Sequence, residues 1–257
     1  MTAPVLDPGL DTVVVVPCFN EEDRLDEDAF LALGRSPAVS LLFVDDGSRD
    51  GTPDVLSRMS TAGTRTAVLT LERNTGKAEA VRRGILRALD DGPGAVAYYD
   101  ADLATPPDQL VRLIAILASR PELVAVLGSR VARLGGAIDR RAVRHYLGRA
   151  YATLASLALG ITVYDTQCGA KVFRVTDALA AAVAHPFRST WAFDVELLHR
   201  LLAGGPGAEP VHPDELLEEP LERWHDVGGS KLRVGAAVRA LADLVVIARA
   251  RRGTARR

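Results

Sequence analysis

The stretch Ala95-Val-Ala-Tyr-Tyr-Asp-Ala-Asp102 joins a short apolar run to a pair of acidic side chains. An unbroken apolar run of this length is typical of a strand that is buried on both faces of a parallel sheet. Asp100 and Asp102 follow at once, so both carboxylates would lie at the carboxyl end of that strand. Such a pair can converge on Mg²⁺ or Mn²⁺, which take a few carboxylates together with phosphate oxygens. The stretch therefore predicts a buried strand that ends in a metal site.

Four more apolar runs of similar length alternate with helical patterns along the first half of the chain. The runs are Thr12–Val16, Ser40–Val44, Ala67–Leu71 and Leu123–Leu127, and the helical stretches are roughly Glu21–Leu33, Thr52–Thr61, Lys77–Asp90 and Pro107–Ser119. This repetition predicts an α/β fold, with a mostly parallel central sheet, right-handed crossovers and flanking helices. Ligands of such sheets bind outside the carboxyl ends of the strands.

The second half of the sequence is less regular. Asp139–Gly160 is helical in pattern and carries Arg140, Arg141, Arg144 and Arg149; Ala170–Val175 predicts a strand, Ser189–Leu202 a helix, and 234–257 an amphipathic helix with a basic tail. No stretch has the composition of a linker. The 257 residues therefore predict a single domain.

Composition excludes several classes of protein. The net charge of -2 argues against a protein that binds nucleic acid through overall charge. The two cysteines, Cys18 and Cys168, do not form a disulfide framework, which favours a reducing cytoplasm. We expect no signal peptide in residues 1–11 and no transmembrane helix, because no apolar run reaches about 18 residues.

Polar and glycine-containing segments follow four of the predicted strands. They are Asn20-Glu21, Asp45-Asp46-Gly47-Ser48, Asn74-Thr75-Gly76-Lys77 and Asp100-Ala101-Asp102. Taken alone, Asp100 and Asp102 could be solvated loop residues or a helix cap before Pro106, and Asp46 could belong to an ordinary turn. Four such loops at one sheet edge instead predict one shared site, in which Asp46 accepts from a uracil or ribose and Lys77 contacts a base or phosphate.

The other candidates each have an ordinary alternative. Arg130, after the fifth strand, could hold a phosphate or be a surface arginine. Asp194 could be a base or a first-turn helix acid. His225 could complete a metal shell or be an unliganded loop residue. Ser230 and Lys231 follow two glycines, an arrangement suited to phosphate. Cys168 is interpreted as a packed small residue rather than a nucleophile.

The motifs resemble a known family. Val16-Pro-Cys-Phe-Asn-Glu-Glu22, Val44-Asp-Asp-Gly-Ser48, Asn74-x-Gly76-Lys77-x-x-Ala80 and Asp100-Ala-Asp102 resemble, in this order, the family-two glycosyltransferases of the GT-A (Rossmann-like) fold. Asp165-Thr-Gln-Cys-Gly169, Trp191-Ala-Phe-Asp194 and Trp224-x-x-x-Gly-x-Ser230-Lys231 are similar to the dolichyl-phosphate β-glucosyltransferase branch, relatives of dolichol-phosphate mannose synthases. Nearly the whole chain is covered.

The resemblance implies an inverting hexosyltransferase that uses a nucleotide sugar, with UDP-glucose expected and GDP-mannose as the alternative. The residues that it implies for the donor are Pro17, Phe19, Glu21, Asp46, Lys77, Ala101 and Arg130, with Asp100 and Asp102 holding Mg²⁺ or Mn²⁺. We expect about 11–130 to bind the nucleotide sugar, about 131–233 to bind the acceptor, and 234–257 to form the C-terminal helix and tail.

The acceptor is left open between two kinds of molecule. Members of the branch usually carry a membrane-anchoring helix, and none is expected here. In the first alternative, the protein contacts the inner face of a membrane peripherally, through the arginines of 139–160 and the basic C-terminal helix, and its acceptor is a polyprenyl phosphate. In the second alternative, the acceptor is a soluble small molecule with a hydroxyl group, and Asp194 is the leading candidate for the catalytic base.

Two other functional classes are less consistent with the sequence. A sugar nucleotidyltransferase would show a glycine-rich loop with Arg-Pro-Lys character after the first strand, and Val16-Pro-Cys-Phe-Asn20 has none. A non-catalytic binding module would not need the intact acids Asp100, Asp102 and Asp194.

Overall fold

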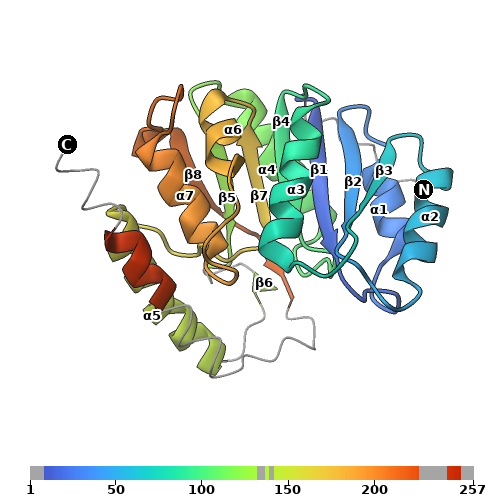
Figure 1. The fold of residues 1–257 in the computed structure, drawn as a ribbon, viewed down its shortest axis with the longest axis horizontal. Helices are drawn as coiled ribbons and strands as arrows, with labels where there is room; N and C mark the ends of the chain where they lie inside the picture. The colour runs from blue at the N-terminus through green and yellow to red at the C-terminus, as the bar shows by residue number, and fades with distance from the viewer. Residues whose placement is uncertain (1–8, 132–136, 139–141, 226–241, 250–257) are drawn as a thin grey trace.

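A seven-stranded sheet organises the chain, with strand order β3-β2-β1-β4-β7-β5-β8 (Figure 1). The computed structural model describes residues 9–131, 137–138, 142–225 and 242–249, and for 137–138 and 142–147 the backbone alone. The strands of this sheet are β1 (Thr12–Cys18), β2 (Val39–Asp45), β3 (Thr66–Thr70), β4 (Ala95–Tyr99), β5 (Ala125–Ser129), β7 (Ala170–Arg174) and β8 (Leu216–Pro220). A short parallel pair, β6 (Ala137–Ile138) and β9 (Arg223–Trp224), lies outside it.

Helices cover both faces of the sheet and produce two apolar cores. The helices are α1 (Glu27–Leu33), α2 (Thr52–Ala62), α3 (Lys77–Leu89), α4 (Pro107–Ser119), α5 (Ala142–Leu159), α6 (Asp177–Val183) and α7 (Phe193–Ala203), with a 3-10 turn at Pro213–Glu215. One core joins the sheet to α3, α5, α6, α7 and the helical residues 242–249; the other joins it to α1, α2 and α4. Successive strand residues alternate between the cores, so Tyr98 faces α7 and Tyr99 faces α1.

The mostly parallel α/β prediction is confirmed, and one strand departs from it. β1, β2, β3 and β4 pair in parallel, as do β5 and β8. β7 runs antiparallel between β4 and β5, and its first residue, Ala170, pairs with Tyr99. The segment that precedes β7 therefore arrives at the carboxyl end of β4, beside Asp100.

Several predicted boundaries shift because local hydrogen bonds decide where a helix begins. The first helix starts at Glu27 rather than Glu21, since the Asp26 carboxylate accepts from the Ala29 amide at 3.0 Å. The predicted Ser189–Leu202 helix starts at Phe193, because the Ser189 hydroxyl accepts a hydrogen bond from the Ala192 amide in the turn that precedes the helix. The fifth strand lies two residues later than predicted, and α6 and β8 were not predicted.

Part of the predicted C-terminal helix is described. Residues 242–249 are helical, and Leu244 and Ile247 are buried in the core that also includes α5 and α7. Arg140, Arg141 and residues 226–241 and 250–257 lie outside the described residues. Within the described ranges, no helix has the length and apolar character needed to cross a membrane.

Candidate active site

The loops that follow β1 and β2 are fastened to each other. The Asn20 amide donates to the Ser48 hydroxyl at 3.0 Å, and the Asn20 side-chain carbonyl accepts from the Arg49 amide at 2.9 Å. The Glu21 amide donates to the Thr52 hydroxyl at 2.8 Å. Phe19, on the first of these loops, leaves 39% of its surface exposed. The pair of loops therefore presents an apolar ring at the edge where a nucleoside was predicted.

Asp46 connects the loop after β2 to the loop after β3. Its carboxylate accepts from the Thr75 amide and hydroxyl, both at 2.7 Å, and from the Gly76 amide at 2.7 Å. Gly47 has φ of 68°, and a Cβ there would lie 2.6 Å from the backbone of Arg73. Asp46 is therefore a buried brace for the loop that carries Lys77, a role that the sequence did not indicate; its contact with a nucleoside stays a prediction.

Asp100 lies between Lys77 and the loop that precedes β7. Lys77 Nζ lies 2.6 Å from Asp100 Oδ1. The Asp100 amide donates to the Gly169 carbonyl at 2.8 Å. Desolvation opposes the charge of Lys77, but the carboxylates of Asp100, Asp194 and Asp102 outweigh it and raise the pKa of the ammonium. Lys77 is therefore held as a cation at the centre of the site.

Negative charge is crowded around Asp102. Burial raises the pKa of the Asp102 carboxyl, and the charge of Asp100 raises it further. Burial also raises the pKa of Glu21, where Arg24 opposes the shift and Asp102 and Asp100 add to it. Carboxylates that disfavour each other's ionisation are stabilised by a cation. Asp100 and Asp102 thus have the oxygen chemistry and the charge that a hard divalent metal requires.

Arg130 is held in a fork by Asp165. Its Nε and Nη2 donate to the two carboxylate oxygens at 2.6 and 2.8 Å, and its guanidinium lies 5.4 Å from the centre of the Trp224 ring. Glu218 in turn accepts from the amides of Tyr164 and Asp165, at 2.8 and 2.6 Å. This chain of contacts fixes Arg130 at the end of β5, and its predicted phosphate contact stays a prediction.

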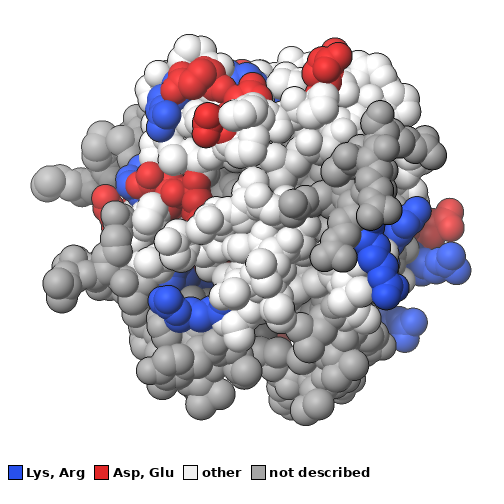
Figure 2. Space-filling view, turned by 90° about the vertical axis from the view of Figure 1, so that its left-hand side faces the viewer, with Lys and Arg blue, Asp and Glu red and all other residues white. Residues whose placement is uncertain are grey.

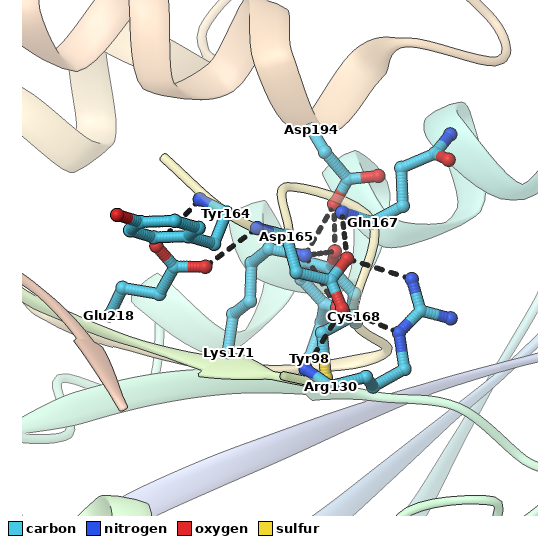
Figure 3. Close-up of polar contacts among 9 residues, drawn as sticks. All are labelled: Tyr98, Arg130, Tyr164, Asp165, Gln167, Cys168, Lys171, Asp194 and Glu218. Carbon is cyan, nitrogen blue, oxygen red and sulfur yellow. Dashed lines mark hydrogen bonds and ion pairs between the residues drawn. The ribbon is translucent and has the colours of Figure 1, made fainter. Parts of the chain in front are cut away.

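Asp194, in the first turn of α7, is buried and ion-paired. Lys171 Nζ lies 2.8 Å from Asp194 Oδ1, and the Tyr98 hydroxyl donates to the same oxygen. These three side chains come from α7, β7 and β4 and meet in one place (Figure 3). The structure thus brings Asp194 to the edge that carries Lys77 and Asp100.

His225 lies next to the loop after Asp102, because its amide donates to the Ala104 carbonyl at 3.0 Å. Its side chain is exposed. Among the described residues, no group of three or more His, Cys, Asp or Glu side chains forms a metal cluster, so a ligand role for His225 stays a prediction. Ser230 and Lys231 lie outside the described residues.

Comparison with known proteins identifies the family of the chain. Residues 13–179 match the model of the family described as "Glycosyl transferase family 2". The chain belongs to glycosyl transferase family 2. This glycosyltransferase is 34% identical to the dolichyl-phosphate β-glucosyltransferase of Drosophila melanogaster over 90% of this chain and 73% of the relative. It is 31% identical to a dolichyl-phosphate β-glucosyltransferase of Trichomonas vaginalis over 92% of this chain and 70% of the relative.

Solved structures confirm the GT-A fold of the glycosyltransferase. Glucosyl-3-phosphoglycerate synthase from Mycobacterium tuberculosis, in complex with Mn²⁺, UDP and glucosyl-3-phosphoglycerate, matches with a TM-score of 0.69 and 19% identity over 93% of this chain and 80% of that one. A mannosyltransferase from Pyrobaculum calidifontis, in complex with GDP-Man and Mn²⁺, matches with a TM-score of 0.51 and 21% identity over 83% of this chain and 58% of that one. These likenesses show the fold of the chain.

Sequence reasoning missed three partners in the glycosyltransferase site, of which Tyr98 and Lys171 are buried. Tyr98 and Lys171 were interpreted only as members of predicted strands, and Glu218 was not singled out. A lysine within an otherwise apolar strand such as Ala-Lys-Val-Phe is a usable signal, because a buried ammonium requires an acidic partner. The sequence does not say which acid that partner is.

Proposed function

We propose that this glycosyltransferase moves glucose from UDP-glucose to a polyprenyl phosphate, with inversion at the anomeric carbon. The observation that carries the proposal is the 34% identity to a dolichyl-phosphate β-glucosyltransferase over 90% of the chain. A match of that extent includes most of 131–233, where we place the acceptor, as well as about 11–130, where we place the nucleotide sugar.

The arrangement of charges supports a diphosphate leaving group. A divalent metal held by Asp100 and Asp102 would neutralise the charge that UDP gains when it leaves. Lys77, kept charged by Asp100, Asp194 and Asp102, adds a second cation on the same side. Phe19 offers an exposed ring against which the uracil can pack, and Arg130 stands at the end of β5 for a phosphate.

The chemistry needs no proton transfer if the acceptor is a phosphate. The bond from C1 of glucose to the β-phosphate oxygen breaks, and its electron pair leaves with UDP. An oxygen of the acceptor phosphate forms the new bond to C1 from the opposite side. A phosphate monoester is already an anion at neutral pH, whereas a hydroxyl acceptor would have to lose its proton to a base such as Asp194.

An apolar surface supports contact with a membrane. Leu154 and Leu157 of α5 are 41% and 70% exposed, and Val245 and Val246 in the helical residues 242–249 are 50% and 45% exposed. α5 contains arginines and no acidic residue. Figure 2 looks at this side of the molecule and shows a broad area without charged side chains. Helices with exposed apolar residues and basic charge bind at the surface of anionic bilayers.

The acceptor and donor can be tested together. Purified protein is incubated with UDP-glucose or GDP-mannose, Mn²⁺, and either a short-chain polyprenyl phosphate in detergent or 3-phosphoglycerate. We expect glucosyl transfer to the polyprenyl phosphate with release of UDP, and none when EDTA is added. Transfer to 3-phosphoglycerate alone would contradict the lipid acceptor, and transfer of mannose alone would contradict the donor.

Membrane contact is tested with vesicles that contain anionic lipid. Leu157→Asp is expected to lower co-sedimentation with these vesicles while turnover of a water-soluble short-chain acceptor is kept. Thr61→Asp, an exposed position on α2, provides the matched control. Equal sedimentation of the two variants would contradict the assignment of this surface.

A further inference from the structure

Three polar side chains are buried together at the centre of the site. Lys171 and Tyr98 are each 1% exposed, and Asp194 is 6% exposed. Figure 3 shows Lys171 and Tyr98 reaching from the sheet toward the Asp194 carboxylate, which descends from α7. A buried lysine and a buried aspartate are costly unless they are paired and hydrogen-bonded. We therefore expect these three buried side chains to serve the reaction as well as the fold.

Lys171 uses every donor that it has inside the protein. An ammonium carries three N–H groups. Lys171 Nζ donates to the Tyr98 hydroxyl at 2.5 Å, to the Cys168 carbonyl at 2.5 Å and to Asp194 Oδ1 at 2.8 Å. No donor is left for a substrate phosphate, so the charge of Lys171 acts on the protein itself.

The two carboxylate oxygens of Asp194 differ in their hydrogen bonds. Oδ1 accepts from both Lys171 and Tyr98, whereas no described residue donates to Oδ2. Asp194 also lies beside the donor site, because Lys171 connects it to the Cys168 carbonyl, and the next residue, Gly169, accepts a hydrogen bond from the Asp100 amide at 2.8 Å. The carboxylate is thus anchored by one oxygen while the other remains available on the side of the reacting groups.

We infer that Lys171 and Tyr98 are positioning residues that lock Oδ1 of Asp194, so that Oδ2 is presented to the transferred sugar and the acceptor. The inference rests on the proposed function only in taking Asp194 as the side chain that faces the reacting groups. The antiparallel direction of β7 makes the lock possible, because it places Lys171 opposite Tyr98 in the register of the sheet.

A double-mutant cycle between Lys171→Met and Asp194→Asn tests the lock. We expect Lys171→Met alone to lower kcat on the order of 100-fold, because a small misplacement of a side chain that faces the reacting groups can have an effect of that size. The KM values for donor and acceptor should change little. In the Asp194→Asn background the same substitution should lower kcat by less than about twofold, since coupled residues do not contribute additively.

Two further variants separate positioning from loss of folding. Tyr98→Phe keeps the ion pair and removes both hydrogen bonds of the hydroxyl, the one that it donates to Asp194 and the one that it accepts from Lys171, so kcat should fall about tenfold in a folded protein. Arg174→Met removes another cation from β7, but the Arg174 guanidinium donates to the backbone carbonyls of Leu117, Arg120 and Leu123. Arg174→Met should lower stability while kcat is kept.

The outcomes that overturn the inference are distinct. A raised KM for the phosphate acceptor with unchanged kcat in Lys171→Met would mean that Lys171 binds the substrate directly. Urea unfolding provides a readout that needs no turnover: Lys171→Met should destabilise the wild type much more than it destabilises Asp194→Asn. Additive losses of stability would overturn the lock, whereas a wild type that transfers no glucose would count against the proposed function alone.

Discussion

Asp100 and Gly169 are in such close contact that no side chain fits between them. The Asp100 amide donates to the Gly169 carbonyl at 2.8 Å, and a Cβ on Gly169 would lie 2.1 Å from Asp100 Oδ2. Gly169 belongs to the segment that enters the antiparallel strand β7, so the direction of that strand determines what surrounds the acids that are predicted to bind the metal. The loop from Asp165 to Gly169 thus adjoins the predicted donor site as well as belonging to the predicted acceptor half.

Replacing Gly169 with alanine should displace Asp100. Because the methyl group would overlap the carboxylate, we expect Gly169→Ala to raise the Mn²⁺ concentration needed for half-maximal turnover and to lower kcat at least tenfold, with a stability loss of about 1–3 kcal/mol. Metal titration of turnover and urea unfolding measure these effects. Gly34→Ala is a matched control, since its Cβ would meet only ordinary contacts at 3.4 Å. Equal metal dependence in the two variants would disprove the steric account.

Asp102→Ala should abolish metal-dependent turnover and leave the fold intact. The carboxylate is a predicted metal ligand, and burial together with the charge of Asp100 already disfavours its ionisation. Removing it relieves that repulsion, so the metal-free variant should be at least as stable as the wild type at pH 7. UDP release in Mn²⁺ and unfolding in EDTA measure the two effects. Turnover at the wild-type level, or wild-type turnover that persists in EDTA, would contradict the metal assignment.

Asp46→Ala should raise the KM for the nucleotide sugar and lower stability. Its carboxylate accepts three hydrogen bonds from Thr75 and Gly76, and a hydrogen bond to a charged group contributes about 1.5–3 kcal/mol. Thr75→Val removes the hydroxyl donor alone and should give a smaller effect of the same kind. Steady-state kinetics with UDP-glucose and urea unfolding measure both variants. Wild-type stability in Asp46→Ala would show that the carboxylate does not brace this loop.

The first half of the fold was predictable because its strands are apolar and its loops carry recognisable polar residues. The boundaries of β4 and α4 were predicted to the residue, and the edge where Asp46, Lys77 and Asp100 gather follows from parallel pairing. The direction of β7 was not predictable, since Ala-Lys-Val-Phe-Arg has the same apolar pattern in either orientation. What selects the antiparallel pairing is long-range contact with β4 and β5.

The site was predicted as a set of side chains but not as a set of pairs. Asp194 and Lys171 lie 23 positions apart, and Arg130 and Asp165 lie 35 apart, so no local pattern connects them. Sequence motifs identify which residue types meet a ligand, whereas burial decides which of them are already engaged. In the structure, Arg130 and Asp46 form hydrogen bonds with other residues of the protein. Their contacts with the nucleotide-sugar donor stay predictions.

Cys168 should be dispensable for catalysis. Burial raises the pKa of its thiol to about 11, with Asp165 adding to the shift and Arg130 and Lys171 opposing it. A thiol with a raised pKa carries almost no thiolate near pH 7, and the thiolate is the nucleophilic form. We therefore expect Cys168→Ala to keep kcat within about twofold while losing about 1–2 kcal/mol of stability through the small cavity that it leaves.

Labelling with iodoacetamide tests the same interpretation without mutation. At pH 7 the folded protein should leave Cys168 unmodified, because the thiol is protonated and fully buried, whereas the urea-unfolded protein should be modified at both cysteines. Peptide mapping by mass spectrometry identifies the modified residue. Rapid modification of Cys168 in the folded protein, or a folded Cys168→Ala variant without turnover, would show that the thiol takes part in the reaction rather than in packing against Gly128.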